Sequence, residues 1–305
     1  MTTFNIENYL DSLPETITKI DVSCKDLHYL PPDITKFKNL KLFICNNNEL
    51  TSLPTLPESI EVVFCCHNNL IYLPDLHENL QRLSCGNNRL TSLPDLPHNL
   101  EYLSCSQNKL TSLPNLPETL RHLYCGNNRL TYLPNLPKNL ISLSCSQNKL
   151  TSLPNLPETL ISLSCYQNKL TSLPNLPETL EGLTCNDNEL TSLPDLPHNL
   201  EYLRFYQNKL TSLPNLPETL QYLYFWNNPI YQAINHPDLD VVKQNIQIVN
   251  LFRHLYYSLK FKRQFRVWLW EKVREPNIRI KYSPKYLITN LTDEDTDLDM
   301  VLNNW

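Results

Sequence analysis

The chain has 305 residues and a formal net charge of −5, with 26 Lys and Arg against 31 Asp and Glu. No apolar stretch approaches the length of a membrane-spanning helix. The N-terminal MTTFNIENYL lacks the basic region and apolar run of a signal peptide, so we expect none.

Residues 1–16 are predicted to form an N-terminal cap. Their apolar residues have the spacing of one short amphipathic helix that ends at Pro14. These residues are Phe4, Ile6, Tyr9, Leu10 and Leu13. We expect the helix to cover the open end of a core, as the terminal units of repeat arrays must.

Residues 17–230 are built from a short repeat. From Leu40 to Thr219 the unit L-x-x-L-x-C-x-x-N-x-L-T-x-L-P-x-L-P-x-x recurs with a period of twenty. Residues 140–159 and 160–179 differ at one position only, where Tyr166 replaces Ser146. The first unit, residues 17–39, is irregular. A fixed period of this length indicates a solenoid.

The first half of the unit predicts a short strand that stacks in parallel on its neighbours. Apolar residues at positions 4 and 6 should face the core, while positions 3, 5 and 7, including Ser146, should face solvent. Position 9 is Asn in ten successive units, where it can bond backbone groups of the bend. Since the chain has only three Gly, Asn should supply most of the turn chemistry.

The second half of the unit cannot be helical, because two prolines three residues apart remove donors and favour extended backbone. In a polyproline conformation the leucines at positions 14 and 17 share one face. We expect that face to meet the strand leucines and to close a narrow core.

The unit resembles the leucine-rich repeat family, in the twenty-residue LPX form of bacterial secreted effectors and giant-virus proteins. The resemblance implies an α/β solenoid, an arc with a parallel β-sheet on the concave face and extended convex segments, which binds proteins on the concave face. Effectors that are ubiquitin ligases add a large C-terminal domain with a catalytic Cys. Here the last Cys is Cys185, so the resemblance does not imply ligase activity.

Eight of the ten cysteines occupy position 6 of successive units. They are Cys45, Cys65, Cys85, Cys105, Cys125, Cys145, Cys165 and Cys185. A disulfide ladder, a metal stack and a small buried apolar residue would each explain this spacing. The last is favoured because Phe205 and Phe225 later take the same position. Reduced thiols in turn predict a cytoplasmic protein.

The outward-facing strand positions are the candidate binding residues. A first group, Leu42, Ile44, Val62, Phe64 and Cys66, is either a binding surface or is covered by the N-terminal segment. The middle strands present mainly Ser. The predicted partner-binding residues are aromatic side chains and one Arg, the types that dominate interface energetics. They are Tyr166, Tyr202, Arg204, Tyr206, Tyr222, Tyr224 and Trp226. We expect no other group on this face to combine large rings with a planar cation. The alternative is that the C-terminal segment packs onto these rings.

Residues 231–291 are predicted to form a helical C-terminal cap. Asp238 is a candidate N-cap, and apolar residues follow at helical spacing, with a second helical run that should end before Pro276. The expectation is that these helices bury their apolar side and leave their basic residues solvated. Residues 268–287 resemble a tail found on giant-virus proteins. Residues 292–305 form an acidic tail that is predicted to be disordered.

No catalytic or metal-ligating set is visible in the sequence. His98 and His198 lie five units apart, about 24 Å in a stacked sheet, which is too far to share a metal. We therefore predict a non-enzymatic, monomeric scaffold with a protein partner and no cofactor, small-molecule substrate or specific nucleic acid. The resemblance favours a viral protein that acts on host proteins. The alternatives are a substrate adaptor for a ubiquitin ligase, and a protein that binds anionic membranes or nucleic acid through its basic C-terminal helices.

Overall fold

A computed structural model describes residues 4–269 and Glu271. The chain divides into two compact units, Met1–Ile246 and Gln247–Trp305.

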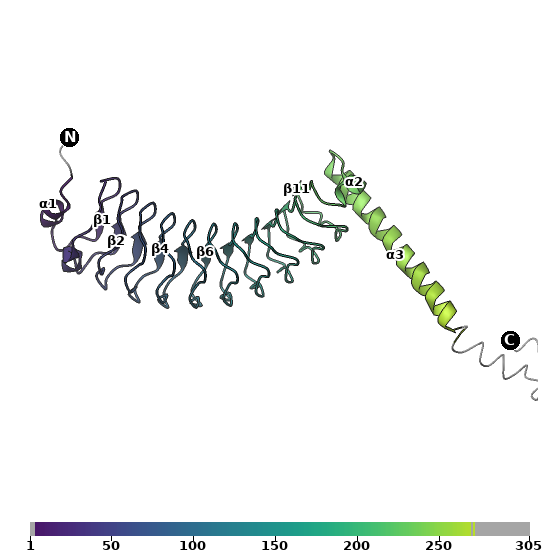
Figure 1. The fold of residues 1–305 in the computed structure, drawn as a ribbon, viewed down its shortest axis with the longest axis horizontal. Coiled ribbons are helices and arrows are strands. Elements are labelled where there is room, and N and C mark those ends of the chain that lie inside the picture. Colours follow the sequence, from purple (N-terminus) through teal and green to yellow (C-terminus); the bar gives the residue numbers. More distant parts are fainter. Residues whose placement is uncertain (1–3, 270, 272–305) are drawn as a thin grey trace, which may run out of the picture. The chain divides into compact units, whose positions relative to one another are not determined.

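Eleven parallel strands form a single sheet in the first unit, in chain order from β1 to β11. The strands are β1 (Lys19–Asp21), β2 (Leu42–Ile44), β3 (Val62–Phe64), β4 (Arg82–Ser84), β5 (Tyr102–Ser104), β6 (His122–Tyr124), β7 (Ser142–Ser144), β8 (Ser162–Ser164), β9 (Gly182–Thr184), β10 (Tyr202–Arg204) and β11 (Tyr222–Tyr224). Figure 1 shows successive repeats stacked side by side. From β2 onward, paired residues are one repeat apart, as in the pairing of Leu143 with Leu163. The predicted parallel-sheet solenoid is therefore confirmed.

Each strand alternates between the core and the surface. In β7, Leu143 is 1% exposed, whereas the flanking Ser142 and Ser144 remain partly exposed. Cys145, two residues beyond Leu143, is also fully buried. The predicted inward positions 4 and 6 are thus correct.

The outward orientation of position 7 does not make every residue there accessible. Ser146 is only 3% exposed, and its Oγ lies 2.9 Å from Oγ of Ser164. Position 7 of one repeat lies beside position 5 of the next, so a small side chain is covered by its neighbour. The expectation that Ser146 faces solvent is therefore wrong.

The segment opposite the strand is extended, as predicted, but only one of its two leucines is reliably buried. In residues 140–159, Leu153 is buried and Leu156 is half-buried. The same difference between positions 14 and 17 holds in most repeats. The chain already turns back at this point, because the position 18 carbonyl accepts the N–H of the following residue 1, as Pro137 does from Leu140 at 3.2 Å. Position 17 therefore lies at the margin of the core.

The position 9 asparagines bond backbone groups of the bend, as predicted, and they also tie consecutive repeats together. Nδ2 of Asn148 donates to the carbonyl of Cys145 in its own repeat and to that of Cys125 in the preceding one, both at 3.1 Å. Its Oδ1 accepts the N–H of Leu130 at 2.9 Å. One side chain thus satisfies backbone groups of two repeats that would otherwise be left unpaired in the bend.

The strained turn residue is at position 8, not at the Asn of position 9. From Asn47 to Asn227 every position 8 residue has a left-handed backbone, with φ between 52° and 57°. Gln fills this position four times, and no Gly of the chain has a positive φ. Asn therefore supplies the hydrogen bonds of the turn, while several residue types carry its strain.

The eight position 6 cysteines form a column in the core, and each is fully buried. Burial raises the pKa of every one of these thiols. The predicted role as a small buried residue is confirmed. All ten cysteines of the chain have free thiols, and Cys24 is the exposed one.

A short helix, α1 (Ile6–Asp11), caps the N-terminal end and buries Ile6 and Leu10. Oδ1 of Asn5 accepts the N–H of Asn8 at 2.7 Å and so fixes the start of the helix. The predicted cap helix is present, although it ends at Asp11. A 3₁₀ turn, η1 (Pro32–Lys36), lies beside it, and Lys36 Nζ is 2.8 Å from Asp11 Oδ1.

The C-terminal end of the core is closed by α2 (Tyr231–Ile234) and the first two turns of α3 (Leu239–Leu269). Ile234, Val242 and Ile246 are buried here. Nζ of Lys243 donates to the carbonyl of Glu218 at 3.1 Å. Asp238 caps α3, since its Oδ1 accepts the N–H of Asp240 at 2.9 Å. The predicted N-cap is confirmed.

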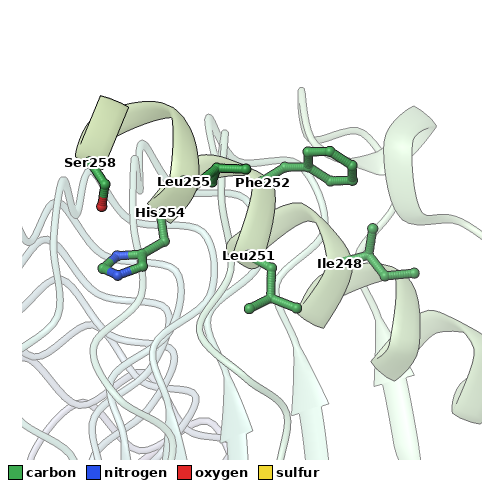
Figure 2. Close-up of a pocket in the computed structure, with 6 residues that line it drawn as sticks. All are labelled: Ile248, Leu251, Phe252, His254, Leu255 and Ser258. Atoms are coloured by element: carbon green, nitrogen blue, oxygen red, sulfur yellow. The ribbon is translucent and has the colours of Figure 1, made fainter. Parts of the chain in front are cut away.

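In the second unit α3 continues as one helix to Leu269, where two helical runs were expected. Leu251, Phe252 and Leu255 are 68%, 69% and 54% exposed, and Figure 2 shows them projecting from its turns. The expected burial of the apolar side therefore stops at Ile246. The end predicted before Pro276 and the tail 292–305 lie outside the described residues. Among the helices that the structure describes, none has the length and apolarity to cross a membrane.

Candidate protein-binding surface

The exposed sheet face is the surface formed by positions 3, 5 and 7 of the repeats. Each strand presents its first and third residues there, as β10 presents Tyr202 and Arg204. The strictly repeated leucines and cysteines lie on the other side of the sheet. Among the strand positions, the differences between repeats therefore lie on this face.

The predicted residues of the last two strands form one contiguous group, the C-terminal cluster. It consists of Tyr202, Arg204, Tyr206, Tyr222, Tyr224 and Trp226. The rings of Tyr206 and Trp226 are stacked, with centroids 4.1 Å apart and an angle of 6° between their planes. Tyr224 meets Trp226 edge-on at 6.1 Å. Tyr202 lies 6.1 Å from Tyr222 and 5.9 Å from Tyr224.

Arg204 is the cation of this cluster. Its guanidinium carbon lies 5.3 Å from the ring centroid of Tyr202 and 4.9 Å from that of Tyr224. Among the described residues its side chain makes no salt bridge, and its Nε is buried without a hydrogen-bond partner. The rings therefore hold the cation, and no carboxylate of the described chain neutralises it.

Asn186 lies at position 7 of its repeat, beside Arg204 at position 5 of the next. Ser146 and Ser164 are related in the same way. Oδ1 of Asn186 is also buried and has no partner, although its Nδ2 donates to Asp187. Nε of Arg204 at position 5 is thus an unpaired donor, and Oδ1 of Asn186 at position 7 of the preceding repeat is an unpaired acceptor. The residues at the same two positions, Ser164 and Ser146, contact each other.

Tyr166 does not join the cluster. It is half-buried at position 7 of its repeat, and position 7 of the next repeat, between it and Tyr206, is Asn186. Within the described part of the chain no ring contact links Tyr166 to the others.

The C-terminal cap touches one edge of the cluster. A hollow is lined by Tyr222 and Tyr224 on one side and by His236, Leu239 and Val242 on the other. Tyr222 and Trp226 are nevertheless 55% and 44% exposed. Within the first unit, the C-terminal segment therefore packs against Tyr222 and Tyr224 at one edge of the cluster and leaves the rest of the rings uncovered.

The apolar group near the N-terminus is half-buried on the same face. Its members are Leu42, Ile44, Val62, Phe64 and Cys66. The polar side-chain contacts of α1 go to Tyr29 and Lys36. These two contacts place α1 against the first repeat, residues 17–39.

A second cluster was missed by sequence reasoning. In this middle cluster Tyr102 lies 5.5 Å from Tyr124 and 6.1 Å from His122, and the guanidinium carbon of Arg82 is 5.0 Å from the Tyr102 centroid. Burial raises the pKa of the Tyr102 phenol. The expectation of a single ring–cation cluster is wrong, because Arg82, Tyr102, His122 and Tyr124 come from three strands and are brought together only by the register of the sheet. The sequence signal for this second cluster is that Tyr102 and Tyr202 occupy the same place in two repeats.

The described residues hold no group of three or more His, Cys, Asp or Glu side chains that could bind a metal ion. His98 and His198 instead use their backbone N–H groups, which donate to Glu78 and Glu178. Rings, a cation and hydroxyl groups on an open surface suit binding by contact area and complementary charge.

Comparisons with known proteins agree with this architecture. Residues 78–118 and 98–138 match the family model of Leucine Rich repeats (2 copies). The leucine-rich effector protein YopM from Yersinia pestis is 38% identical, with a TM-score of 0.67 over 70% of this chain and 61% of that one. A chain of the complex of Latrophilin 3, Unc5D and FLRT2 has 23% identity and a TM-score of 0.61 over 71% of this chain and 77% of its own. No curated protein matches the sequence.

These matches support the fold described above. The fold is a leucine-rich-repeat solenoid, and its repeats are similar to those of a bacterial effector. It spans about three-fifths of the YopM structures that it matches.

Proposed function

We propose that this protein is a binding scaffold that recognises a protein partner through the exposed sheet face, with the C-terminal cluster as the main contact. The observation that carries the proposal is the arrangement of that cluster. It joins a pair of stacked rings to a guanidinium that no described carboxylate neutralises. Large rings that are already ordered contribute contact area at a low cost in conformational entropy.

The class of protein supports the same function. The FLRT2 component that carries leucine-rich repeats is found in a complex with two other proteins, and YopM is an effector. Proteins of this fold commonly act as scaffolds for protein–protein interaction. A viral origin, a host partner and a cytoplasmic location stay predictions from the sequence.

Site-specific photo-cross-linking tests the proposal. A photoreactive phenylalanine analogue replaces Tyr222, which is 55% exposed on the sheet face, or Tyr132, which is 57% exposed outside that face. The proposal predicts covalent adducts with cell proteins from position 222 and few from position 132. Equal adducts from both positions would show that capture does not depend on the sheet face.

A second candidate function rests on the exposed part of α3. Leu251, Phe252 and Phe261 are 68%, 69% and 65% exposed, and Lys262 and Arg263 lie on the same helix. Apolar and cationic residues together suit an anionic membrane surface. Sedimentation with vesicles of anionic and of neutral lipid decides this candidate. It requires binding to the anionic vesicles that is lost when Leu251 and Phe252 are changed to Ser.

The ubiquitin-ligase adaptor is tested by shortening the chain. A cut after Ile246 retains the buried Ile234 and Val242, whereas a cut at Asn235 would remove Val242 from the core. Ligase subunits captured by the full chain but not by the chain shortened at Ile246 would favour the adaptor.

A further inference from the structure

The two ring–cation clusters are related by the repeat. Residues 92–128 and 192–228 are identical at 30 of 37 positions. Tyr102 corresponds to Tyr202, and Tyr124 to Tyr224. The two tyrosines of each pair lie at similar separations, 5.5 Å between Tyr102 and Tyr124 and 5.9 Å between Tyr202 and Tyr224. The same platform therefore occurs twice on one face of the sheet.

Each platform carries an arginine that has no carboxylate partner. Arg82 lies over Tyr102, and Arg204 lies against Tyr202 and Tyr224. Neither arginine takes part in a salt bridge among the described residues. Nε of Arg204 is buried, but a guanidinium on the face of a ring can still offer its two terminal NH₂ groups to a carboxylate in a bidentate manner.

The strands between the two platforms carry small side chains at positions 3 and 5. The residues at positions 3 and 5 of β7, β8 and β9 are small: Ser142, Ser144, Ser162, Ser164, Gly182 and Thr184. At positions 3 and 5 a bound polypeptide could cross these strands without meeting a bulky side chain, while Tyr166 stands half-buried at position 7 of the β8 repeat. With strands about 4.8 Å apart, the five or six strand steps between the platforms correspond to about 24–29 Å.

We infer that the chain binds one protein partner at both clusters, and that the partner places a carboxylate side chain on Arg82 and another on Arg204, about 24–29 Å apart. The inference rests on the proposed function and adds a second site and a ligand chemistry to it. The exposed Glu101 and Glu201 each precede a tyrosine of a platform. They would repel a polyanion, so the inferred partner carries separate carboxylates and not a nucleic acid or an acidic run.

A set of synthetic peptides tests the inference with the full chain. Each peptide carries a Glu–Trp pair at both ends of a rigid proline rod of about 9, 28 or 47 Å (roughly three, nine or fifteen residues). Binding is measured by fluorescence anisotropy. A peptide with one Glu–Trp end gives the single-site affinity, and rods with Gln in place of Glu test the need for carboxylates.

The 28 Å rod is expected to bind at least about tenfold more tightly than the single-ended peptide and the other two rods, because only it reaches both sites. Arg82→Gln and Arg204→Gln should each reduce its affinity to the single-ended value. Arg89→Gln removes the same charge from an exposed turn and should change nothing. The Gln-ended rods should bind weakly.

Three results would overturn the inference: no binding of the 28 Å rod, no dependence on rod length, or unchanged affinity in Arg82→Gln. A loss confined to Arg204→Gln would remove the second site and leave the proposed function standing. Failure of the proposed function would appear separately, as adducts that do not depend on position 222 in the cross-linking experiment.

Discussion

The indole of Trp226 lies flat against the phenol ring of Tyr206, with ring centroids 4.1 Å apart and planes 6° from parallel. The two residues occupy position 7 of consecutive repeats. Stacked parallel strands are about 4.8 Å apart, so aromatic side chains at the same position of neighbouring repeats are held close to stacking distance by the backbone. The repeat itself thus orders a flat platform before any partner arrives.

Asn148→Ala is expected to lower the free energy of unfolding by about 2–4 kcal/mol, because it leaves buried backbone groups of two repeats unpaired. Asn148 donates to the carbonyls of Cys125 and Cys145 and accepts the N–H of Leu130. Urea denaturation measures the change. Asn155→Ala is the control, since Asn155 is exposed in the same repeat. Equal losses in the two variants would contradict the assigned role of position 9.

Alkaline pH is expected to destabilise the chain through its cysteine column. Burial raises the pKa of these thiols in the folded state, so they stay protonated there, whereas in the unfolded chain they ionise above about pH 8.5. Their stabilising contribution is fully present below that pH and declines above it. The loss between about pH 7.5 and 9 should be about 0.8 kcal/mol per thiol, and about 6 kcal/mol for the eight.

Cys145→Ala provides the comparison for this effect. Its cavity should make it less stable at neutral pH, but it should lose about 0.8 kcal/mol less than the parent chain between about pH 7.5 and 9. Urea denaturation across that range measures both slopes. Parallel slopes would mean that the thiol of Cys145 ionises equally in the folded and unfolded states.

The reactivity of the thiols is expected to follow their exposure. In the native chain Cys24 should react first with an aromatic disulfide reagent, because it is exposed, and Cys66 more slowly. The eight buried thiols should react only after denaturation, which brings the total to ten. Titration without reductant gives both numbers. Fewer than ten thiols after denaturation would reveal disulfides and argue against the predicted reducing compartment.

Gln107→Gly is expected to stabilise the chain by about 0.5–1 kcal/mol. Gln107 has φ of 57°, a conformation that strains a residue with a side chain, and Gly relieves that strain at some cost in unfolded-state entropy. Lys109→Gly, two residues further on and also exposed, should instead destabilise by about 0.5–1 kcal/mol. Thermal melting of the two variants measures both signs. Destabilisation by both would argue against strain at position 8.

The sequence predicts the architecture because one pattern repeats with a fixed period. Alternation around Leu143 and Cys145 specifies which side of the strand is buried, and Asn148 specifies the bend. Two details of the unit follow from three-dimensional neighbours and were predicted wrongly. Ser146 is covered by Ser164 of the next repeat, and Leu156 lies where the chain is already turning back.

The candidate surface is only partly predictable from sequence for the same reason. The C-terminal cluster stands out because its aromatic residues lie in two consecutive repeats. The middle cluster combines Arg82, Tyr102, His122 and Tyr124 from three strands, and its unity becomes clear only when the register places them side by side. The sequence also does not predict that α3 is exposed beyond Ile246. Helical spacing indicates which side of a helix is apolar, but not how many of its turns are buried.

The central claim is that a partner is held by the C-terminal cluster on the exposed sheet face. Its most direct test is quantitative affinity capture with the full chain, comparing Tyr206→Ala/Trp226→Ala with Tyr72→Ala/Tyr132→Ala. The second variant also removes two rings, which are 58% and 57% exposed outside the sheet face. We predict that both variants melt within a few degrees of the parent chain, and that only the first loses the captured proteins. Capture that is unchanged in the first variant, or lost equally in both, would contradict the claim.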